Sequence, residues 1–180
     1  MRGAGVSAAG TVEVVLGDAA AARAYGEALA GVLRAGDLVL LTGPLGAGKT
    51  TLTQGIGAGL GVRGQVASPT FIIARVHPPL AVGPALVHVD AYRLESLDDL
   101  EALDLDASLE DSVTVVEWGE GLAEVLAEDR LEVTIERPRA GEVAPEDADA
   151  GERRVSLRAV GPRWAGVHLP EQQAGRASRA

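Results

Sequence analysis

The chain of 180 residues contains no cysteine. Disulfide bonds and thiolate metal sites are therefore excluded, which agrees with a reducing compartment. The sequence also lacks any apolar run of about 18 residues or more, so no helix is predicted to span a membrane. Residues 1–15 contain no apolar stretch long enough for a signal peptide. These absences together predict a cytoplasmic protein with no membrane partner.

Aromatic residues and positive charge are both scarce. Aromatics make up 3% of the chain, so the core has to be built from Val, Leu, Ile and Ala. The formal net charge is −10, whereas nucleic-acid binding draws most of its affinity from Lys and Arg side chains that neutralise phosphates. The chain is therefore a poor candidate for binding RNA or DNA unaided, and a partner protein is expected to hold any nucleic acid involved.

Lysine is almost absent. Among the 16 basic residues, the only lysine is Lys49 and the rest are arginine. A chain that uses arginine wherever a positive charge suffices is expected to keep lysine where a compact ammonium group on a slim stem is needed. Lys49 lies inside a glycine-rich segment, so this segment is the first candidate for a functional site.

The composition otherwise fits one folded unit. Hydrophobic residues make up 47% and charged residues 23% of the chain, which is enough apolar material for the core of a single domain. Residues 1–10, rich in Gly, Ala and Ser, are predicted to be a disordered lead-in. Residues 11–160 are predicted to form the domain, and residues 161–180 a mostly disordered tail.

Strand and helix patterns alternate along the domain. Strands are predicted at 11–16, 37–42, 85–89, 113–116, 131–136 and 154–160, with an extended segment at 68–76. Helices are predicted at 19–34, 49–60, from Ser96 onward and at 122–126. Asp18 is expected to cap the first of them. Ser96 and Asp99 are expected to form a capping box at the start of the third, with Leu97, Leu100 and Leu103 facing inward. Strands that are apolar on both faces indicate a central parallel sheet covered by helices on each side. We therefore expect an α/β fold of three layers with a mainly parallel sheet, in which 131–136 is an edge strand and the last two strands form an antiparallel C-terminal edge.

The glycine-rich segment at 43–50, GPLGAGKT, matches the phosphate-loop pattern G-x-x-x-x-G-K-[ST] at every fixed position. Its glycines let backbone N–H groups point inward as a nest for phosphate oxygens, and the following helix adds its positive end. The alternative, an accidental glycine-rich turn, is disfavoured by the flanking strand and helix and by the lone lysine. The pattern predicts a P-loop NTPase fold that binds a nucleoside triphosphate with Mg²⁺, with these binding residues: Gly43, Leu45, Gly46, Ala47, Gly48, Lys49, Thr50 and Thr51.

Two acidic residues follow predicted parallel strands. Asp90 and Glu117 each come after four or five apolar residues, and such positions lie beside the phosphate loop, at the carboxyl ends of the strands. Carboxylates there hold the metal or orient water; the alternative for either is a simple turn former. Thr70 belongs to a polar loop that could sense the terminal phosphate or could equally begin a strand. Trp118 could stack on a base or partner, or cap the core. His88 is expected to face the sheet interior or to make a hydrogen bond, and not to serve in catalysis.

Four segments, GPLGAGKTT (43–51), SPTF (68–71), HVDAYRL (88–94) and VEWGE (116–120), together resemble the TsaE (YjeE) family in order and spacing. The resemblance spans about residues 11–160. It implies a weak ATPase that supports formation of threonylcarbamoyladenosine beside the anticodon of tRNA. It also implies partner subunits of the TsaD and TsaB type, which transfer the threonylcarbamoyl group and present the tRNA, so that tRNA is contacted only indirectly.

The resemblance assigns roles residue by residue. Lys49 would hold the phosphates, while Thr50 and Glu117 would be the two protein ligands of magnesium. Three further positions match family motifs: Asp90 is the acid of a Walker-B-like strand, Thr70 the switch-loop threonine, and Trp118 the tryptophan beside the metal-binding acid. Pro44 departs from the family, which often has an acid at this position, and should leave the phosphate nest intact.

Two alternatives remain open from the sequence. A small-molecule kinase is also built on a phosphate loop, but such kinases usually carry an arginine-rich lid. No clustered arginines occur before residue 137. A regulatory module that binds a nucleotide without using it is the other alternative, and the presence of both Asp90 and Glu117 argues mildly against it.

Overall fold

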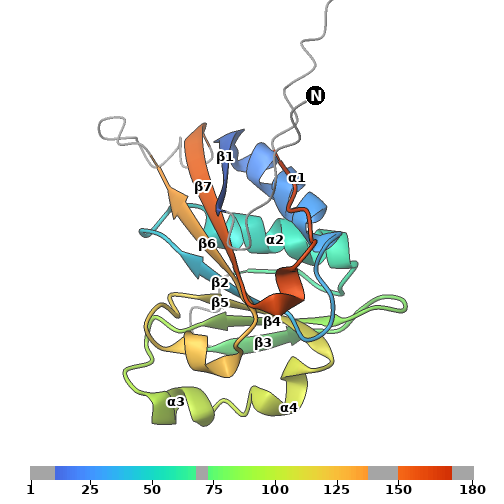
Figure 1. The fold of residues 1–180 in the computed structure, drawn as a ribbon, viewed down its shortest axis with the longest axis vertical. Helices are drawn as coiled ribbons and strands as arrows, with labels where there is room; N and C mark the ends of the chain where they lie inside the picture. Colours follow the sequence, from blue (N-terminus) through green and yellow to red (C-terminus); the bar gives the residue numbers. More distant parts are fainter. Residues whose placement is uncertain (1–10, 68–72, 138–149, 172–180) are drawn as a thin grey trace, which may run out of the picture.

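The computed structural model describes residues 11–67, 73–137 and 150–171 (Figure 1). These residues form one seven-stranded sheet in the order β1-β7-β6-β2-β5-β4-β3. The strands are β1 (Thr11–Asp18), β2 (Leu38–Thr42), β3 (Ala74–His77), β4 (Ala85–Asp90), β5 (Ser112–Glu117), β6 (Arg130–Glu136) and β7 (Ala150–Val160). The α-helices are α1 (Ala19–Ala30), α2 (Lys49–Leu60), α3 (Leu97–Glu101) and α4 (Asp106–Leu109), and two 3-10 turns cover Ala123–Leu126 and Pro162–Trp164.

The centre of the sheet is parallel. β2 pairs in parallel with both β5 and β6, and β4 pairs in parallel with β5. β3 adds an antiparallel edge beside β4, and β7 and β1 add two antiparallel strands beyond β6. This arrangement is of the P-loop NTPase type, so the predicted fold class is confirmed.

The predicted position of the strand at 131–136 is wrong. β6 lies inside the sheet, between β2 and β7, and β1 forms the edge on that side. The side chains of β6 do alternate: Leu131, Val133 and Ile135 are buried, whereas Thr134 and Glu136 are exposed. Alternation reports that one face of the strand is covered. Alternation does not distinguish an edge strand, which is hydrogen-bonded to one other strand, from an inner strand, which is hydrogen-bonded to two.

Helices cover both faces of the parallel half of the sheet. Leu38 and Leu40 of β2 join one apolar cluster, which includes Leu100 of α3. Val39 and Leu41 join the opposite cluster with side chains of α1 and α2. Figure 1 shows α1 and α2 on one side of the sheet and α3 and α4 on the other. The predicted three layers are therefore confirmed, and the burial of β2 on both faces explains its continuous apolar sequence.

The caps of two helices follow the sequence, but their lengths do not. The Asp18 carboxylate accepts a hydrogen bond from Ala21 N at 2.7 Å, and Ser96 and Asp99 form the predicted capping box. α1 ends at Ala30, short of the predicted residue 34. In α3, Leu97 was expected to face inward but is 46% exposed, because a helix of five residues directs only Leu100 into the core.

The glycines of α2 bring it close to α1. A Cβ atom on Gly55 would lie on the carbonyl oxygen of Arg23, and one on Gly59 would lie 2.8 Å from the carbonyl oxygen of Glu27. On the facing helix, a Cβ atom on Gly26 would lie 2.5 Å from the Leu52 carbonyl oxygen. Contacts of this length with backbone cannot be relieved by a side-chain movement, so the two helices require glycine at these positions.

Gly55→Ala is therefore expected to destabilise the fold by about 1–3 kcal/mol through overpacking. Helix propensity alone predicts the opposite sign, since alanine is favoured over glycine by about 1 kcal/mol in a helix. Urea denaturation would measure the difference. Gly17→Ala is the matched control, because nothing lies within 4 Å of its Cβ position; an equal loss in both variants would contradict the close-packing explanation.

The predicted disordered tail begins too early. Residues 161–171 pack against the domain, and Trp164 is buried in the core cluster with α1 and α2. Arg163 Nε and Nη2 donate to the two oxygens of the Asp37 carboxylate at 2.8 Å each, and Tyr25 Oη donates to the Pro170 carbonyl at 2.7 Å. Short apolar side chains separated by Gly and Pro gave no periodic signal for this segment. The rest of the predicted tail and the lead-in 1–10 lie outside the described residues.

No helix among the described residues is long and apolar enough to cross a membrane.

Candidate nucleotide-binding site

The phosphate loop joins the end of β2 to the start of α2, as the sequence predicted. Three of its glycines, Gly43, Gly46 and Gly48, have positive φ angles of 153°, 76° and 107°. Gly48 is also closely packed, since a Cβ atom there would lie 3.0 Å from Arg153 Nε. No side chain in the described part of the chain caps the N-terminus of α2, so its first N–H groups face the loop and are suited to an anion.

Lys49, the first residue of α2, folds back over this loop. Its ammonium group donates to the Gly43 carbonyl at 2.7 Å and to the Pro44 carbonyl at 3.0 Å. The side chain is only 5% exposed. Burial lowers the pKa of the Lys49 ammonium, and the nearby carboxylates of Glu117 and Asp90 oppose this shift. The predicted phosphate-binding lysine therefore already lies at the loop.

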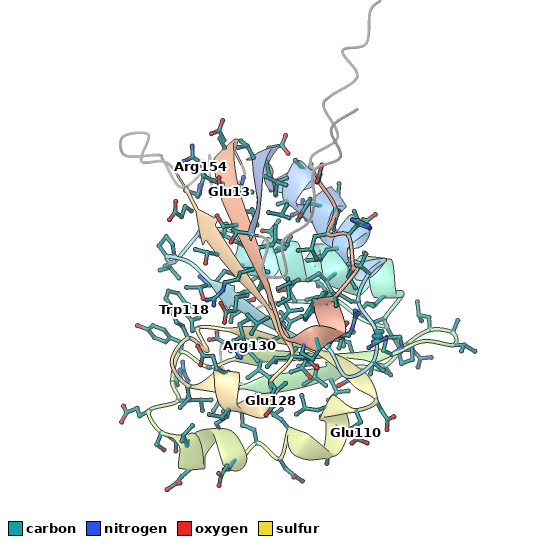
Figure 2. All side chains as sticks on the ribbon, in the orientation of Figure 1. Glu13, Glu110, Trp118, Glu128, Arg130 and Arg154 are labelled. Carbon is teal, nitrogen blue, oxygen red and sulfur yellow. The ribbon has the colours of Figure 1, made fainter. Side chains whose placement is uncertain are left out.

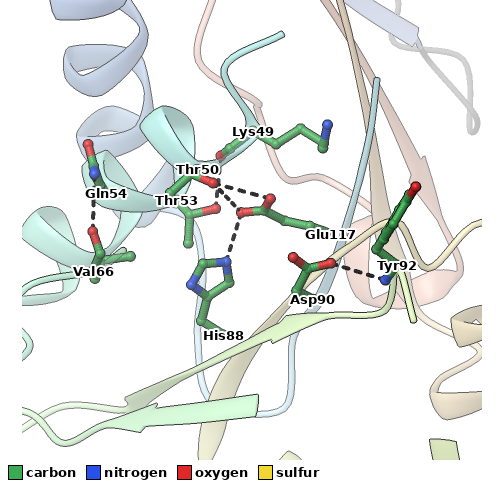
Figure 3. Close-up of polar contacts among 9 residues, drawn as sticks. All are labelled: Lys49, Thr50, Thr53, Gln54, Val66, His88, Asp90, Tyr92 and Glu117. Carbon is green, nitrogen blue, oxygen red and sulfur yellow. Dashed lines mark hydrogen bonds and ion pairs between the residues drawn. The ribbon is translucent and has the colours of Figure 1, made fainter. Parts of the chain in front are cut away.

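Thr50 and Glu117 meet across the gap between α2 and β5 (Figure 3). The Thr50 hydroxyl lies 3.1 Å from one oxygen of the Glu117 carboxylate and 3.3 Å from the other. Glu117 is the last residue of β5 and is 3% exposed. The two residues predicted to share a metal ion are thus brought into direct contact, although they are 67 positions apart in the sequence.

The Glu117 carboxylate has a second partner that the sequence did not identify. His88 Nε2 lies 2.8 Å from Glu117 Oε1, and His88 is completely buried. The sequence predicted that His88 faces the sheet interior or makes a hydrogen bond. Both are correct, but the identity of the partner depends on the register of β4 against β5, for which the local sequence carries no signal.

Asp90 lies beside Glu117. The two acids are register partners at the carboxyl ends of β4 and β5, which confirms their predicted placement at one edge of the sheet. Asp90 Oδ1 also accepts a hydrogen bond from Tyr92 N at 3.0 Å, so Asp90 shapes the following turn as well. The turn-forming alternative therefore describes part of what Asp90 does, and Glu117 is the acid that contacts the phosphate-loop helix.

Trp118 covers the site from the side. Its ring centroid lies 3.9 Å from Lys49 Nζ, and Tyr92 packs edge-on against it with centroids 5.4 Å apart. Trp118 has φ = +61°, a conformation that is uncommon for a bulky residue and costs about 1–3 kcal/mol. Figure 2 shows Trp118 at the edge of the molecule. Trp118 is therefore a wall of the site and not a cap on the core.

The remaining predicted residues differ in placement. Leu45 at the tip of the loop is 91% exposed, Ala47 is buried, and Thr51 lies half-buried in the first turn of α2. Thr70 lies outside the described residues. The structure adds Arg137, whose guanidinium Nη1 donates to the Gly46 carbonyl at 3.3 Å; the sequence assigned it no role in the site.

The donor set fits magnesium better than a metal held entirely by protein. No group of three or more His, Asp or Glu side chains within the described ranges could hold a metal ion. The site instead offers the Thr50 hydroxyl and the Glu117 carboxylate. Magnesium is usually bound in this way, through one or two protein oxygens, with water and substrate phosphates completing the shell.

Comparisons with known proteins agree on one family. The family model described as "Threonylcarbamoyl adenosine biosynthesis protein TsaE" matches residues 16–143. The tRNA threonylcarbamoyladenosine biosynthesis protein TsaE of Streptomyces coelicolor is 62% identical over 144 residues, which cover 79% of this chain and 93% of that protein. The protein of the same name from Bacillus subtilis is 38% identical over 143 residues, 79% of this chain and 82% of its own length. The crystal structure of Bacillus subtilis YdiB superposes with a TM-score of 0.65 at 29% identity, covering 89% of this chain and 93% of YdiB.

Proposed function

The chain belongs to the TsaE family of tRNA threonylcarbamoyladenosine biosynthesis proteins, and from this premise we propose that it binds ATP with Mg²⁺ and hydrolyses it. In this proposal, hydrolysis supports transfer of the threonylcarbamoyl group to the adenosine beside the anticodon of tRNA. The activity is weak in the isolated chain and is raised by the transferase subunits of the TsaD and TsaB type. These partners hold the tRNA, in keeping with the net charge of −10 of this chain.

The contact between Thr50 and Glu117 carries the proposal. A phosphate loop by itself binds phosphates, and turnover also requires a group that holds the metal beside them. The Thr50 hydroxyl donates its single hydrogen toward Glu117, so its oxygen lone pairs stay available for a cation. The two residues therefore offer adjacent oxygen ligands next to the loop.

The other residues have complementary roles. The loop N–H groups and the Lys49 ammonium would bind the β- and γ-phosphates. Magnesium, when bound, would neutralise the phosphate charge that develops during transfer to water. Asp90, next to Glu117, would orient the attacking water, and Trp118 would shield the phosphates from solvent. Thr70 remains our proposed sensor of the terminal phosphate, as implied by the family resemblance.

Phosphate release from ATP by the wild-type chain and by Glu117→Gln, alone and with the two transferase subunits, tests the proposal. We expect slow release by the wild type alone, faster release with both partners, and a loss of roughly 100-fold in Glu117→Gln under both conditions. The substitution keeps the shape of the side chain and removes the charge that magnesium requires. Glu120→Gln is the matched control, since Glu120 is exposed three residues further on.

Two outcomes would contradict the proposal. Wild-type rates in Glu117→Gln would show that this carboxylate takes no part in turnover. Efficient phosphorylation of a small metabolite, or partner-independent turnover of roughly tens per second, would favour a small-molecule kinase.

A further inference from the structure

We propose that His88 is a positioning residue, which holds the Glu117 carboxylate in the orientation needed for the magnesium of MgATP. The inference deepens the proposed function and rests on it. It starts from a histidine on β4, an inner strand of the sheet, with no exposed surface, whose ring is directed at the same carboxylate that contacts Thr50.

The placement of His88 follows from strand alternation. Leu86 of β4 belongs to the apolar cluster on the α1 and α2 side, whereas Val87 and Val89 belong to the cluster on the other side. His88 shares the face of Leu86 and therefore points toward α2. Glu117 on the neighbouring strand also extends toward α2, so the imidazole approaches it from below while Thr50 approaches from the helix (Figure 3).

The direction of this hydrogen bond can be assigned. A carboxylate has no hydrogen to give, so the Nε2 atom of His88 must carry the proton that lies between it and Glu117 Oε1. The other ring nitrogen, Nδ1, is buried and has no hydrogen-bond partner among the described residues. The Nε2–H tautomer therefore accounts for the observed contact, and the opposite tautomer would leave a lone pair facing a carboxylate.

Two donors fix the carboxylate from different elements. His88 holds Oε1 from β4, and the Thr50 hydroxyl lies within reach of both oxygens from α2. A side chain of Glu with three rotatable bonds would otherwise sample several rotamers, and its ordering would have to accompany metal binding. Groups that hold a ligating side chain in this way typically change metal affinity or activity by about 10- to 100-fold when removed.

The experiment compares two replacements of His88. His88→Met fills a similar volume without a donor, while His88→Gln can place an amide N–H near the position of Nε2. Calorimetric titration with ATP, with and without Mg²⁺, would measure binding independently of turnover. We expect His88→Met to reduce the gain in ATP affinity that Mg²⁺ provides by about 10-fold, to leave magnesium-free ATP binding unchanged within twofold, and to be largely rescued in His88→Gln.

A second buried histidine supplies the matched control. His77 lies on the adjacent strand β3, is also buried, and contacts the Arg63 carbonyl and not Glu117. His77→Met is expected to leave the magnesium dependence of ATP binding unaltered, even if the fold is less stable. An equal loss in His77→Met and His88→Met would overturn the positioning role in favour of a general structural effect.

The tautomer gives a test that does not involve nucleotide. Nitrogen-detected NMR of the imidazole rings in the free chain should find the Nε2–H form for His88, assigned by its disappearance in His88→Gln; the Nδ1–H form would overturn the inference.

If the wild type bound no ATP, the proposed function itself would fail. If the wild type bound MgATP and His88→Met bound it equally well, only the role of His88 would be rejected.

Discussion

Replacing Lys49 with alanine should lower the affinity for MgATP by at least about 100-fold. A hydrogen bond to a charged partner contributes about 1.5–3 kcal/mol, and an ammonium group shared between two phosphates makes more than one of them. The fold should survive, because the contacts of the Lys49 ammonium within the described part of the chain are with the Gly43 and Pro44 carbonyls and the Trp118 ring. Calorimetric titration with ATP and Mg²⁺ would measure the loss.

Thermal unfolding gives an independent reading of the same variant. ATP at about 100 times its dissociation constant for the wild type should stabilise the wild type by about 2.7 kcal/mol, and the same ATP concentration should stabilise Lys49→Ala by no more than about 0.4 kcal/mol. Arg63→Ala removes the same charge from an exposed position beyond the far end of α2 and is the control. Retention of wild-type affinity in Lys49→Ala would contradict the assignment of the site. A comparable loss in Arg63→Ala would indicate a nonspecific effect of net charge.

Arg163→Met should lower the free energy of unfolding by about 3–5 kcal/mol. The guanidinium group of Arg163 binds both oxygens of Asp37 and also donates to the Val32 carbonyl at 2.9 Å. Both side chains are largely buried, and removal of one member of a buried ion pair leaves an uncompensated charge on the other. Denaturation in urea with a two-state fit would provide the value.

Arg130→Met is the matched comparison for this second prediction. Arg130 also pairs with a carboxylate, that of Glu132 at 2.9 Å, but both side chains are partly open to solvent. Its removal should change stability by no more than about 1 kcal/mol. Equal losses in the two variants would show that the bidentate contact of Arg163 with Asp37 adds nothing beyond a surface pair.

The parts of the fold that could be predicted were those that a short, contiguous segment of the sequence determines. The apolar run of β2 followed by GPLGAGKT required a central strand, a phosphate loop and a helix, and the structure has all three. Asp90 and Glu117 could be placed together because parallel strands bring their carboxyl ends to one edge. The strand, loop and helix were predicted from one short segment, and the placement of the two acids was predicted from a rule that applies to all parallel sheets.

The parts that could not be predicted depend on contacts between distant segments. The hydrogen bond from His88 to Glu117 requires a particular register between β4 and β5, and the neighbours of β6 are set by which strands compete to pair with it. Residues 161–171 were missed because their order comes from single anchors, Arg163 and Trp164, and not from a repeating pattern. Alternation and helical periodicity reveal burial only where it repeats along the sequence, so they cannot identify a segment that is held by one or two buried residues.

The antiparallel pairing of β1 with β7 has a consequence for biosynthesis. Thr11 pairs with Arg158 and Leu16 with Arg153, so β1 finds its partner only when β7 emerges from the ribosome, after the other described strands of the sheet. Helix α1 can dock on α2 earlier, because both are made before β3. During translation, β1 is thus an open strand edge tethered to a partly assembled sheet, a species prone to intermolecular pairing. Chaperone demand during synthesis should therefore fall sharply once β7 has left the exit tunnel.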